Sequence, residues 1–355
     1  MRALVTGASG LIGAHLVQLL LSHGHEVRAM VRETSRLDAL ALHPAVIIAA
    51  DVLQADRRLD AACADCDMVF HAAAHFAYTG ISSAALHRTA VAGSDNMLRS
   101  CARMGVRKIV VTSSSVVFGY RVDGTVINER EGITNGIGES PYAEAKIAQH
   151  RRTVELGDRL QLDVRLACPT MTMGPTSSRL GPSNGLIVAY LADPFGCTFP
   201  GGCNIVAARD VALGHLLIAE HGATGESYLL GSQNLTWRQI HTTIAELAGV
   251  APPRLELNHT AAFLAATAEE LRGAMTGHAA LSSREQASMV GRHYWYSHVK
   301  AAGLGYAPIP ARDALVETIS WLAASSHVSR EVRIGMHLTG DIYRFRAASI
   351  RAEQP

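Results

Sequence analysis

The sequence predicts an α/β fold, with a doubly wound parallel sheet and a smaller C-terminal lobe. Short apolar segments alternate with helical segments through the first half of the chain, and a glycine-rich turn joins the first strand to the first helix. Continuous apolar strands separated by helices are typical of a parallel sheet that is covered on both faces. Right-handed crossovers between such strands then give the doubly wound Rossmann arrangement.

The first half of the chain contains the predicted strands of this sheet. A helix over 11–23 follows the first strand, because Leu16 and Leu20 repeat at helical spacing. Another helix begins after Ser140, a favourable N-cap, with Pro141 in its first position. The expected strands cover residues 3–6, 27–31, 46–49, 68–71, 108–112 and 162–166.

After Pro169 the pattern becomes less regular, and Gly and Pro are frequent up to residue 202. Residues 258–292 look helical but poorly defined. We divide the chain into a dinucleotide-binding core with the catalytic residues (1–168), a mixed substrate-binding lobe with returns to the core (169–325), and a peripheral arginine-containing tail (326–355). The regular elements expected in the second half are a helix over 210–221, a strand over 226–230, and helices over 237–248 and 311–324.

Composition excludes several classes of protein. The 355 residues carry 32 basic and 31 acidic side chains, so no charge field predicts nucleic acid as a partner. No uninterrupted apolar run reaches the roughly 18 residues that a membrane helix needs, and Met1 leads directly into a strand, which leaves no room for a signal peptide. Six cysteines scattered through apolar segments indicate buried thiols, so we expect a cytoplasmic protein. Cys63 and Cys66 have zinc spacing but lack a second ligand pair, and we expect no metal.

The segment Thr6–Gly13 has the spacing of a phosphate-binding turn. Gly7 permits the tight turn, Gly10 lets a pyrophosphate approach the backbone, and Gly13 allows helix and strand to pack closely. The helix N-terminus then faces the phosphates. The alternative is a glycine-rich turn without a ligand, but the position between a strand and a helix favours a dinucleotide. The expected contacts are Thr6, Gly7, Ser9, Gly10, Leu11, Ile12 and Gly13.

Arginines follow the second strand, where a carboxylate would select NAD. An Asp or Glu at this position binds the adenosine 2′-hydroxyl of NAD. Arg32 and Arg36 can instead pair with the 2′-phosphate of NADP. We therefore favour NADP(H) as the cofactor and keep NAD(H) as the alternative, in which Arg32 is only a solvated loop charge.

Two further segments are placed to contact the cofactor. Asp51 ends the third strand, where its carboxylate would reach the adenine amine, with Val52 next to it; capping of the following segment is the alternative role for Asp51. The small residues Ala72, Ala73 and Ala74 follow the fourth strand and would let the dinucleotide pass over them.

Tyr142 and Lys146 lie one helical turn apart and are therefore neighbours on one face. A free tyrosine titrates near pH 10, and both a nearby ammonium and a nicotinamide cation favour the phenolate. Tyr142 would then give a proton to a carbonyl oxygen, or remove one from an alcohol, while Lys146 would also hold the ribose hydroxyls. The serines at 113–115 follow the fifth strand, where one hydroxyl can bind the substrate oxygen.

These motifs resemble the extended short-chain dehydrogenase/reductase superfamily over about residues 1–325. The resemblance is carried by Thr6–Gly13, by Thr112–Ser115 and by Tyr142-x-x-x-Lys146. The segments 208–215, 225–231 and 300–306 are similar to the branch that holds dihydroflavonol reductase-like, 3β-hydroxysteroid dehydrogenase-like and NAD-dependent epimerase/dehydratase proteins.

The resemblance implies a nicotinamide-dependent enzyme acting on CH–OH or carbonyl groups. The family's serine falls on Ser114, counted back from Gly119, and Tyr142 and Lys146 complete the catalytic set. Family members commonly pair as homodimers through the helix that bears the tyrosine. Further cofactor contacts are expected at Thr112, Ser113, Pro169, Thr170 and Met171, and substrate contacts at His75, Phe76, Ser115 and Met173. The methionines can alternatively fill the core.

Two positions depart from the family pattern. Ala90 replaces a frequent Asn after the fourth strand, which can weaken local anchoring without abolishing hydride transfer. Cys168 stands before Pro169, where members that act on nucleotide sugars often have an Asn contacting the sugar diphosphate. The second departure argues against a nucleotide-sugar substrate.

Three functions are compatible with these residues. The first is an NADPH-dependent reductase of a ketone or aldehyde on a fairly apolar small molecule, or the reverse oxidation. The second is an NAD-linked sugar-nucleotide epimerase or dehydratase with the same catalytic set. The third is a cofactor-sensing binding protein without activity, which the intact Ser114, Tyr142 and Lys146 argue against.

Overall fold

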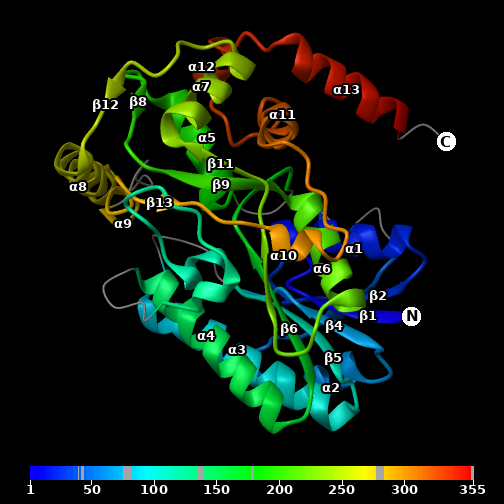
Figure 1. Cartoon of the computed structure of the whole chain (residues 1–355). Helices are drawn as coiled ribbons and strands as arrows, with labels where there is room; N and C mark the ends of the chain where they lie inside the picture. The colour runs from blue at the N-terminus through cyan, green and yellow to red at the C-terminus, as the bar shows by residue number, and fades with distance from the viewer. Residues whose placement is uncertain are drawn as a thin grey trace.

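The computed structural model describes residues 1–38, 40, 44–74, 81–134, 140–176, 180–276 and 284–352. Its central feature is a parallel sheet in the order β10-β6-β5-β4-β1-β2-β3 (Figure 1). The predicted α/β doubly wound fold is therefore confirmed. The strands are β1 (Arg2–Thr6), β2 (Glu26–Val31), β3 (Val46–Ala49), β4 (Met68–His71), β5 (Lys108–Thr112), β6 (Asp163–Pro169) and β10 (Ser227–Leu230).

Alternate residues of the central strands enter two separate cores, because successive side chains point to opposite faces of a sheet. Val5, Phe70 and Val110 pack with helices α1 (Leu11–Ser22) and α6 (Ala208–His221). Their strand neighbours, including Leu4, Val69 and Ile109, pack on the other face with α2 (Arg57–Cys63), α3 (Ser83–Met104) and α4 (Pro141–Arg159). Burial on both faces explains why these strands are continuously apolar in sequence.

Helix α4 begins where the sequence predicts. The Ser140 hydroxyl accepts a hydrogen bond from the Ala143 amide, and Pro141 occupies the first turn. This cap satisfies one of the amides that a helix start leaves unpaired, and the proline needs no partner there. Tyr142 is consequently fixed in the first turn of a helix that lies against α3 (Figure 1).

Strand β6 is longer than predicted and runs through Pro169. Its last residues pair with the edge strand, Cys168 with Leu229 and Pro169 with Leu230. A proline is tolerated at a strand end, where its missing N–H removes little from the ladder. The segment 208–230 thus returns from the lobe to the central sheet and adds its edge strand.

The C-terminal lobe is built on short strands that the sequence analysis did not predict. Strand β9 (Gly202–Ala207) lies between β11 (Gln233–Thr236) and β13 (His293–Tyr294), and β7 (Met171–Met173) also pairs with β9. A second pair joins β8 (Cys197–Thr198) to β12 (Leu255–Glu256). Except for β9, these strands have only two to four residues, and they do not alternate regularly with helices as the central strands do, so no pattern in the sequence marks them. The lobe also contains α5 (Pro182–Ala192), α7 (Trp237–Ala248), α8 (His259–Thr276), α9 (Arg284–Ala287) and α11 (Ala311–Leu322), whereas α10 (Val299–Ala302) packs against β10 of the central sheet.

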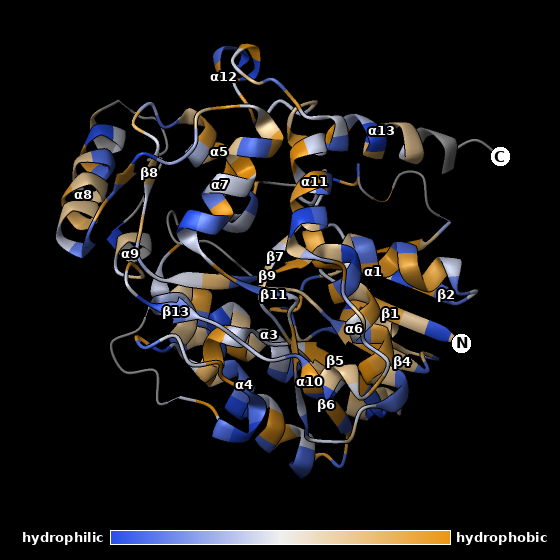
Figure 2. Cartoon of the chain, turned by 45° about the horizontal axis from the view of Figure 1, so that its top comes forward, coloured by the Kyte–Doolittle hydropathy of each residue, from blue (hydrophilic) through white to orange (hydrophobic). Residues whose placement is uncertain are grey.

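The tail holds α12 (Arg330–Ile334) and α13 (Gly340–Ala352), and α13 packs against α11 (Figure 1). Ile342 is fully buried in the lobe core, and the Arg312 guanidinium lies 2.9 Å from the Asp341 carboxylate. Although we expected a peripheral extension, part of the tail is therefore anchored in the lobe. Figure 2 shows hydrophobic residues gathered along the central strands. Within the described ranges, no helix combines the length and apolar character needed to cross a membrane.

Candidate active site

The glycine-rich turn is built to bring the chain close to itself. Gly7 has φ +65°, and a Cβ there would lie 2.8 Å from both the Ala72 carbonyl oxygen and the Ala73 Cα. A Cβ on Gly13 would overlap the Gly7 carbonyl oxygen. Only glycine fits either position, which is the property expected of a backbone cradle for a pyrophosphate.

The N-terminus of α1 is free of side chains that would compete with a phosphate. Its N-cap is Gly10, which makes no side-chain capping bond, and the first turn contains no acidic residue. Thr6 and Ser9 flank the turn, and Leu11 and Ile12 begin the helix, whose first amides have no partner within the helix. An anion binds well at such a helix start, so these residues fit the diphosphate of a nicotinamide dinucleotide.

The predicted adenosine contacts lie at the ends of β2 and β3. The Arg32 side chain is exposed, and its amide is tied to the Ser35 hydroxyl at 3.1 Å. Arg36 is exposed and pairs with Asp38 at 2.9 Å. The Asp51 carboxylate accepts a hydrogen bond from the Leu53 amide, which matches the alternative capping role of this residue.

Val52 and the alanines at 72–74, which are the other predicted cofactor contacts, lie in closely packed segments. The buried Val52 packs close to Gly93, where a Cβ would approach it to 3.0 Å. Ala72 and Ala73 lie beside the turn, and the Ala73 amide donates to the Thr6 hydroxyl at 3.1 Å. Ala74 is exposed next to them.

The predicted catalytic side chains come together in the structure. Ser114 follows β5, and its hydroxyl is hydrogen-bonded to that of Tyr142 from the first turn of α4. Both residues are buried. Burial raises the pKa of Tyr142 to about 12, and the Ser114 hydrogen bond lowers it by less. The net shift is opposite to the one predicted from Lys146, because removing water from the phenolate outweighs the other influences on it.

Lys146 is also buried, and its ammonium is held by two oxygens. It donates to the Thr112 carbonyl at 3.0 Å and to the Gln149 side-chain carbonyl at 2.8 Å. Burial lowers the pKa of Lys146 to about 8, and the Cys168 thiol opposes this shift. Since an ammonium has three N–H donors, one remains after these two bonds for another acceptor, such as a ribose hydroxyl.

Sequence reasoning missed the side chains that support this lysine. Gln149 donates to Ser94 at 2.8 Å, and Ser94 in turn lies 3.2 Å from the His71 ring, all of them buried. The available signal was the spacing of Lys146 and Gln149, three residues apart on a helix, where side chains meet. The position of Ser94 and His71 depends on other strands and could not be inferred from spacing.

Ser113 and Thr112 serve to fix the strand end. The Ser113 hydroxyl pairs with His150 at 2.8 Å, and the Thr112 hydroxyl pairs with His215 at 2.9 Å. Burial is the main cause that lowers the pKa of each of these histidines to about 4. Ser115 is buried in the short helical turn (Ser115–Phe118) that follows Ser114.

The remaining predicted contacts lie on β6 and β7. Pro169 and Thr170 are buried, and the Thr170 hydroxyl donates to Asn204 at 2.8 Å. Met171 is half-buried beside the Cys203 thiol, whereas Met173 is fully buried in the lobe core. His75 and Phe76 lie outside the described residues.

Residues of the lobe close over Tyr142. A small cavity of about 20 Å³ lies at this place. Arg292 is held there by the Tyr120 ring, 4.3 Å from its guanidinium carbon, and by the Tyr294 hydroxyl at 3.5 Å. This arginine was not among the predicted site residues. The lining is Val116, Ser140, Tyr142, Ala143, Ser288, Met289, Arg292 and Tyr294.

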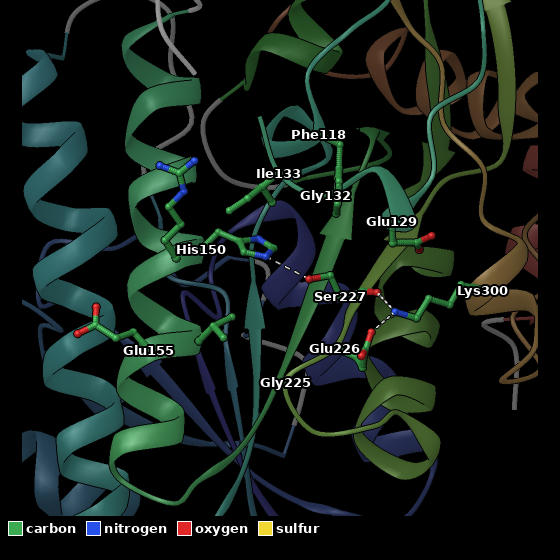
Figure 3. A pocket seen from close by; sticks show the side chains of 12 residues that line it. Phe118, Glu129, Gly132, Ile133, His150, Glu155, Gly225, Glu226, Ser227 and Lys300 are labelled. Carbon is green, nitrogen blue, oxygen red and sulfur yellow. Dashed lines mark hydrogen bonds and ion pairs between the residues drawn. The ribbon is translucent and has the colours of Figure 1, made fainter. Parts of the chain in front are cut away.

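A wider cavity of about 460 Å³ lies at the edge of the sheet between α4 and β10 (Figure 3). Figure 3 shows His150 reaching Ser227, and Lys300 reaching Glu226 and Ser227. None of the three catalytic side chains lines it. The predicted catalytic residue Tyr142 lines the small cavity instead.

Comparison with known proteins agrees with this geometry. The NAD dependent epimerase/dehydratase family matches residues 3–231. A putative dihydroflavonol 4-reductase from Synechocystis sp. is 28% identical over 334 residues, which cover 92% of this chain and 96% of that protein. The crystal structure of gox2253 is similar with a TM-score of 0.81 and 28% identity, covering 92% of this chain and 99% of that one.

The fold extends to more distant structures. The UDP-glucose 4-epimerase of Thermus thermophilus, solved with NAD, has a TM-score of 0.72 at 21% identity, covering 92% of this chain and all (100%) of that one. This likeness shows a shared fold. With the family match over most of the chain, the protein belongs to the NAD-dependent epimerase/dehydratase family of extended short-chain dehydrogenases/reductases and is an enzyme of that type.

Proposed function

We propose that the protein is an NADP(H)-dependent oxidoreductase that reduces a ketone or aldehyde on a fairly apolar substrate, or carries out the reverse oxidation. The observation that carries this proposal is the buried Ser114–Tyr142 hydrogen bond with Lys146 one turn away. When bound, the nicotinamide supplies or accepts the hydride.

In reduction, the Ser114 hydroxyl binds the substrate carbonyl oxygen and orients it toward Tyr142. Tyr142 then donates its phenolic proton to that oxygen, which suits a tyrosine whose high pKa keeps it protonated at neutral pH. Lys146 holds the ribose with its remaining N–H and places positive charge near the phenolate that forms. In oxidation the same groups act in reverse.

The choice of NADP and of an apolar substrate rests on residues near each end of the site. Arg32 follows β2 in place of a carboxylate and is exposed, so it can reach a 2′-phosphate. Val116, Ala143 and Met289 give the cavity beside Tyr142 apolar walls. The similar protein from Synechocystis sp. is called a putative dihydroflavonol 4-reductase, which supports reduction as the reaction.

The test is consumption of NADPH and NADH by the purified protein against a panel of apolar ketones and aldehydes. Tyr142→Phe should lower kcat by about 10²- to 10⁴-fold, the usual size of general acid–base catalysis. Tyr190→Phe is the matched control, since its buried ring loses only the hydrogen bond from its hydroxyl to the Ala251 carbonyl. Equal loss in both variants, or none in either, would contradict the role of Tyr142.

Cofactor choice has its own variant. Arg32→Glu should reduce kcat/KM for NADPH by about 10- to 100-fold, because it replaces a charge-assisted hydrogen bond by repulsion, and should spare NADH. Arg57→Glu makes the same charge change at an exposed site in α2. If the Arg32 variant kept the same preference for NADPH over NADH, residues other than Arg32 would have to select the cofactor.

An epimerase or dehydratase of sugar nucleotides is the second candidate, favoured by the family to which the chain belongs. Cys168 argues against it, since it is buried where a diphosphate-binding Asn would stand. If neither cofactor is consumed while NAD stays bound through purification, this candidate moves ahead and sugar nucleotides are tested next.

We also propose that the protein pairs as a homodimer through α4, the helix that bears Tyr142, which lies beside α3 on one side of the sheet (Figure 1). This proposal is supported by the family resemblance, because members commonly form homodimers through the helix that bears the tyrosine. Light scattering of the wild type and of Val154→Arg, a change at a half-exposed apolar position of α4, tests it: the wild type should have twice the mass of the chain and the variant should dissociate.

A further inference from the structure

A continuous line of buried hydrogen bonds joins the active-site lysine to the glycine-rich turn. The Lys146 ammonium donates to Gln149, the Gln149 amide donates to Ser94, and the His71 ring lies between Ser94 and Thr6. Thr6 is the last residue of β1, directly before Gly7. We propose that Gln149 is a positioning residue that fixes the Lys146 ammonium relative to the dinucleotide cradle, a role that rests on the proposed function and touches no substrate.

Each bond in this line is short, and each residue is buried. The Lys146–Gln149 and Gln149–Ser94 bonds are both 2.8 Å, the Ser94–His71 bond is 3.2 Å, and the His71–Thr6 bond is 2.8 Å. Every member is at most 3% exposed. In such surroundings a donor or acceptor that loses its partner cannot turn to water, so the arrangement is strongly specified.

The directions of these bonds are fixed by counting protons. The Ser94 hydroxyl uses its one proton on the Ala90 carbonyl at 2.8 Å, so it must accept from both Gln149 and His71. His71 therefore carries its proton on Nε2, and its Nδ1 accepts from the Thr6 hydroxyl. The pKa of His71 is lowered to about 3, mainly by burial, and this keeps the ring in the neutral form.

The same count fixes Gln149. Because its amide nitrogen donates to Ser94, its carbonyl oxygen must face the Lys146 ammonium, and the amide cannot turn over without breaking both bonds. At the other end of the line, Thr6 accepts from the Ala73 amide, next to the carbonyl that Gly7 closely approaches. The line thus connects α4, α3, β4 and β1, the elements that carry the lysine and the cradle.

The charge on Lys146 depends on few neighbours. The ionisable groups that act on it are Cys168 from β6, His71 from β4, and His150 from its own helix. Both histidines are neutral at neutral pH, because burial lowers the pKa of each well below 6.5. The ammonium is therefore stabilised mainly by the Gln149 and Thr112 oxygens.

Gln149→Leu tests the role, with NADP⁺ binding measured by calorimetry from pH 6 to 10 on the full chain. Loss of a hydrogen bond to a charged group should weaken binding at pH 7 by about 10- to 100-fold and move the alkaline loss of binding to lower pH by about one to two units. Gln149→Glu should move it to higher pH, because a carboxylate stabilises the ammonium. If Gln149 had only a structural role, the pH at which alkaline conditions abolish binding would be the same in both variants as in the wild type.

Thr153→Val is the matched control on the same helix, because the buried Thr153 hydroxyl has no hydrogen-bond partner among the described residues. It should leave both the affinity and the pH profile unchanged. If Gln149→Leu does not fold, Gln149→Glu decides by itself. Alkaline limbs that coincide with that of the wild type would overturn the inference. Normal NADP⁺ binding without turnover of any carbonyl would overturn only the proposed reaction, and absence of any dinucleotide binding would overturn both.

Discussion

The dinucleotide half and the C-terminal lobe meet at Tyr142 but are held together in different ways. In the first half, parallel strands end side by side, so Thr6, His71 and Thr112 lie at one edge of the sheet. His71 bonds to Thr6 and to Ser94 of α3, and the Thr112 carbonyl accepts from Lys146 of α4. In the lobe, short strands from distant parts of the chain meet on β9, and Asn204 alone makes four hydrogen bonds there. In the first half, the aligned strand ends fix the positions of the polar side chains. In the lobe, the arrangement of the short strands depends on a few hydrogen bonds between side chains and backbone.

Acid should affect the two halves unequally, and this is the largest effect expected. His71, His150 and His215 are buried in or against the central sheet, and His241 is buried in the lobe. Burial lowers the pKa of all four, to about 3 for His71 and about 4 for the others. The folded state then binds fewer protons than the unfolded state below pH 6.5, so stability is complete above that pH and is lost as pH falls.

Each histidine contributes a slope of about 1.4 kcal/mol per pH unit between pH 6 and 5. Urea unfolding at several pH values measures the sum. His241→Gln should reduce the slope by one histidine's share, while the three histidines at the sheet keep the rest. A free energy of unfolding that is flat between pH 6.5 and 5 would contradict the buried neutral state of these rings.

Two glycine substitutions separate the functions of the halves. A Cβ on Gly13 would overlap the Gly7 carbonyl oxygen, and a Cβ on Gly249, at φ +65°, would overlap the His337 carbonyl oxygen. Gly13→Ala should abolish cofactor binding by distorting the cradle. Gly249→Ala should lower the free energy of unfolding by more than about 2 kcal/mol through strain and overlap, with cofactor affinity retained.

Thermal melts and calorimetric titration of NADP⁺ check both variants. Gly24→Ala is the control, since it has φ +76° with open space around its Cβ position and should cost only about 1–2 kcal/mol. If Gly249→Ala weakened cofactor binding as much as Gly13→Ala does, the conclusion that the two halves act independently would be wrong.

Removing one amide should cost more in the lobe than in the first half. Asn204 is 1% exposed and bonds to Thr170, Ser232, Asn234 and Tyr296, so Asn204→Ala should cost about 2–4 kcal/mol. Among the described residues, the Asn96 side chain makes one hydrogen bond, to the Val52 carbonyl at 2.9 Å, and Asn96→Ala should cost about 1 kcal/mol. Chemical denaturation compares them, and equal costs would remove the special place of Asn204.

The smallest effect concerns the anchoring of the tail. Ile342 of α13 is fully buried against the lobe, and Ile342→Val removes one methylene from that contact. We expect a loss of about 0.5–1.5 kcal/mol with unchanged cofactor binding. Ile334→Val is the control, because Ile334 in α12 is 71% exposed and should be neutral. A neutral Ile342→Val would show that α13 adds nothing to the stability of the lobe.

Much of the first half could be predicted from sequence because its signals are local. The glycine spacing, the Ser140–Pro141 helix start and the apolar strands each act over a few residues, and the structure has them where they were predicted. Strand order placed the serines at 113–115 near the expected ligand crevice, and only the family resemblance singled out Ser114 among them. The direction of the Tyr142 pKa shift could not be predicted, because burial depends on atoms contributed by the rest of the chain.

The sequence by itself therefore determined the central sheet and the glycine-rich turn, since periodicity and spacing encode them directly, and it predicted Tyr142 and Lys146 as a pair on one helix face. Only the tertiary structure decided which groups surround them: Gln149 with Ser94 and His71 behind the lysine, Arg292 beside the tyrosine, and α13 against the lobe. These contacts join residues far apart in the chain, and their geometry arises from packing, which no local pattern specifies.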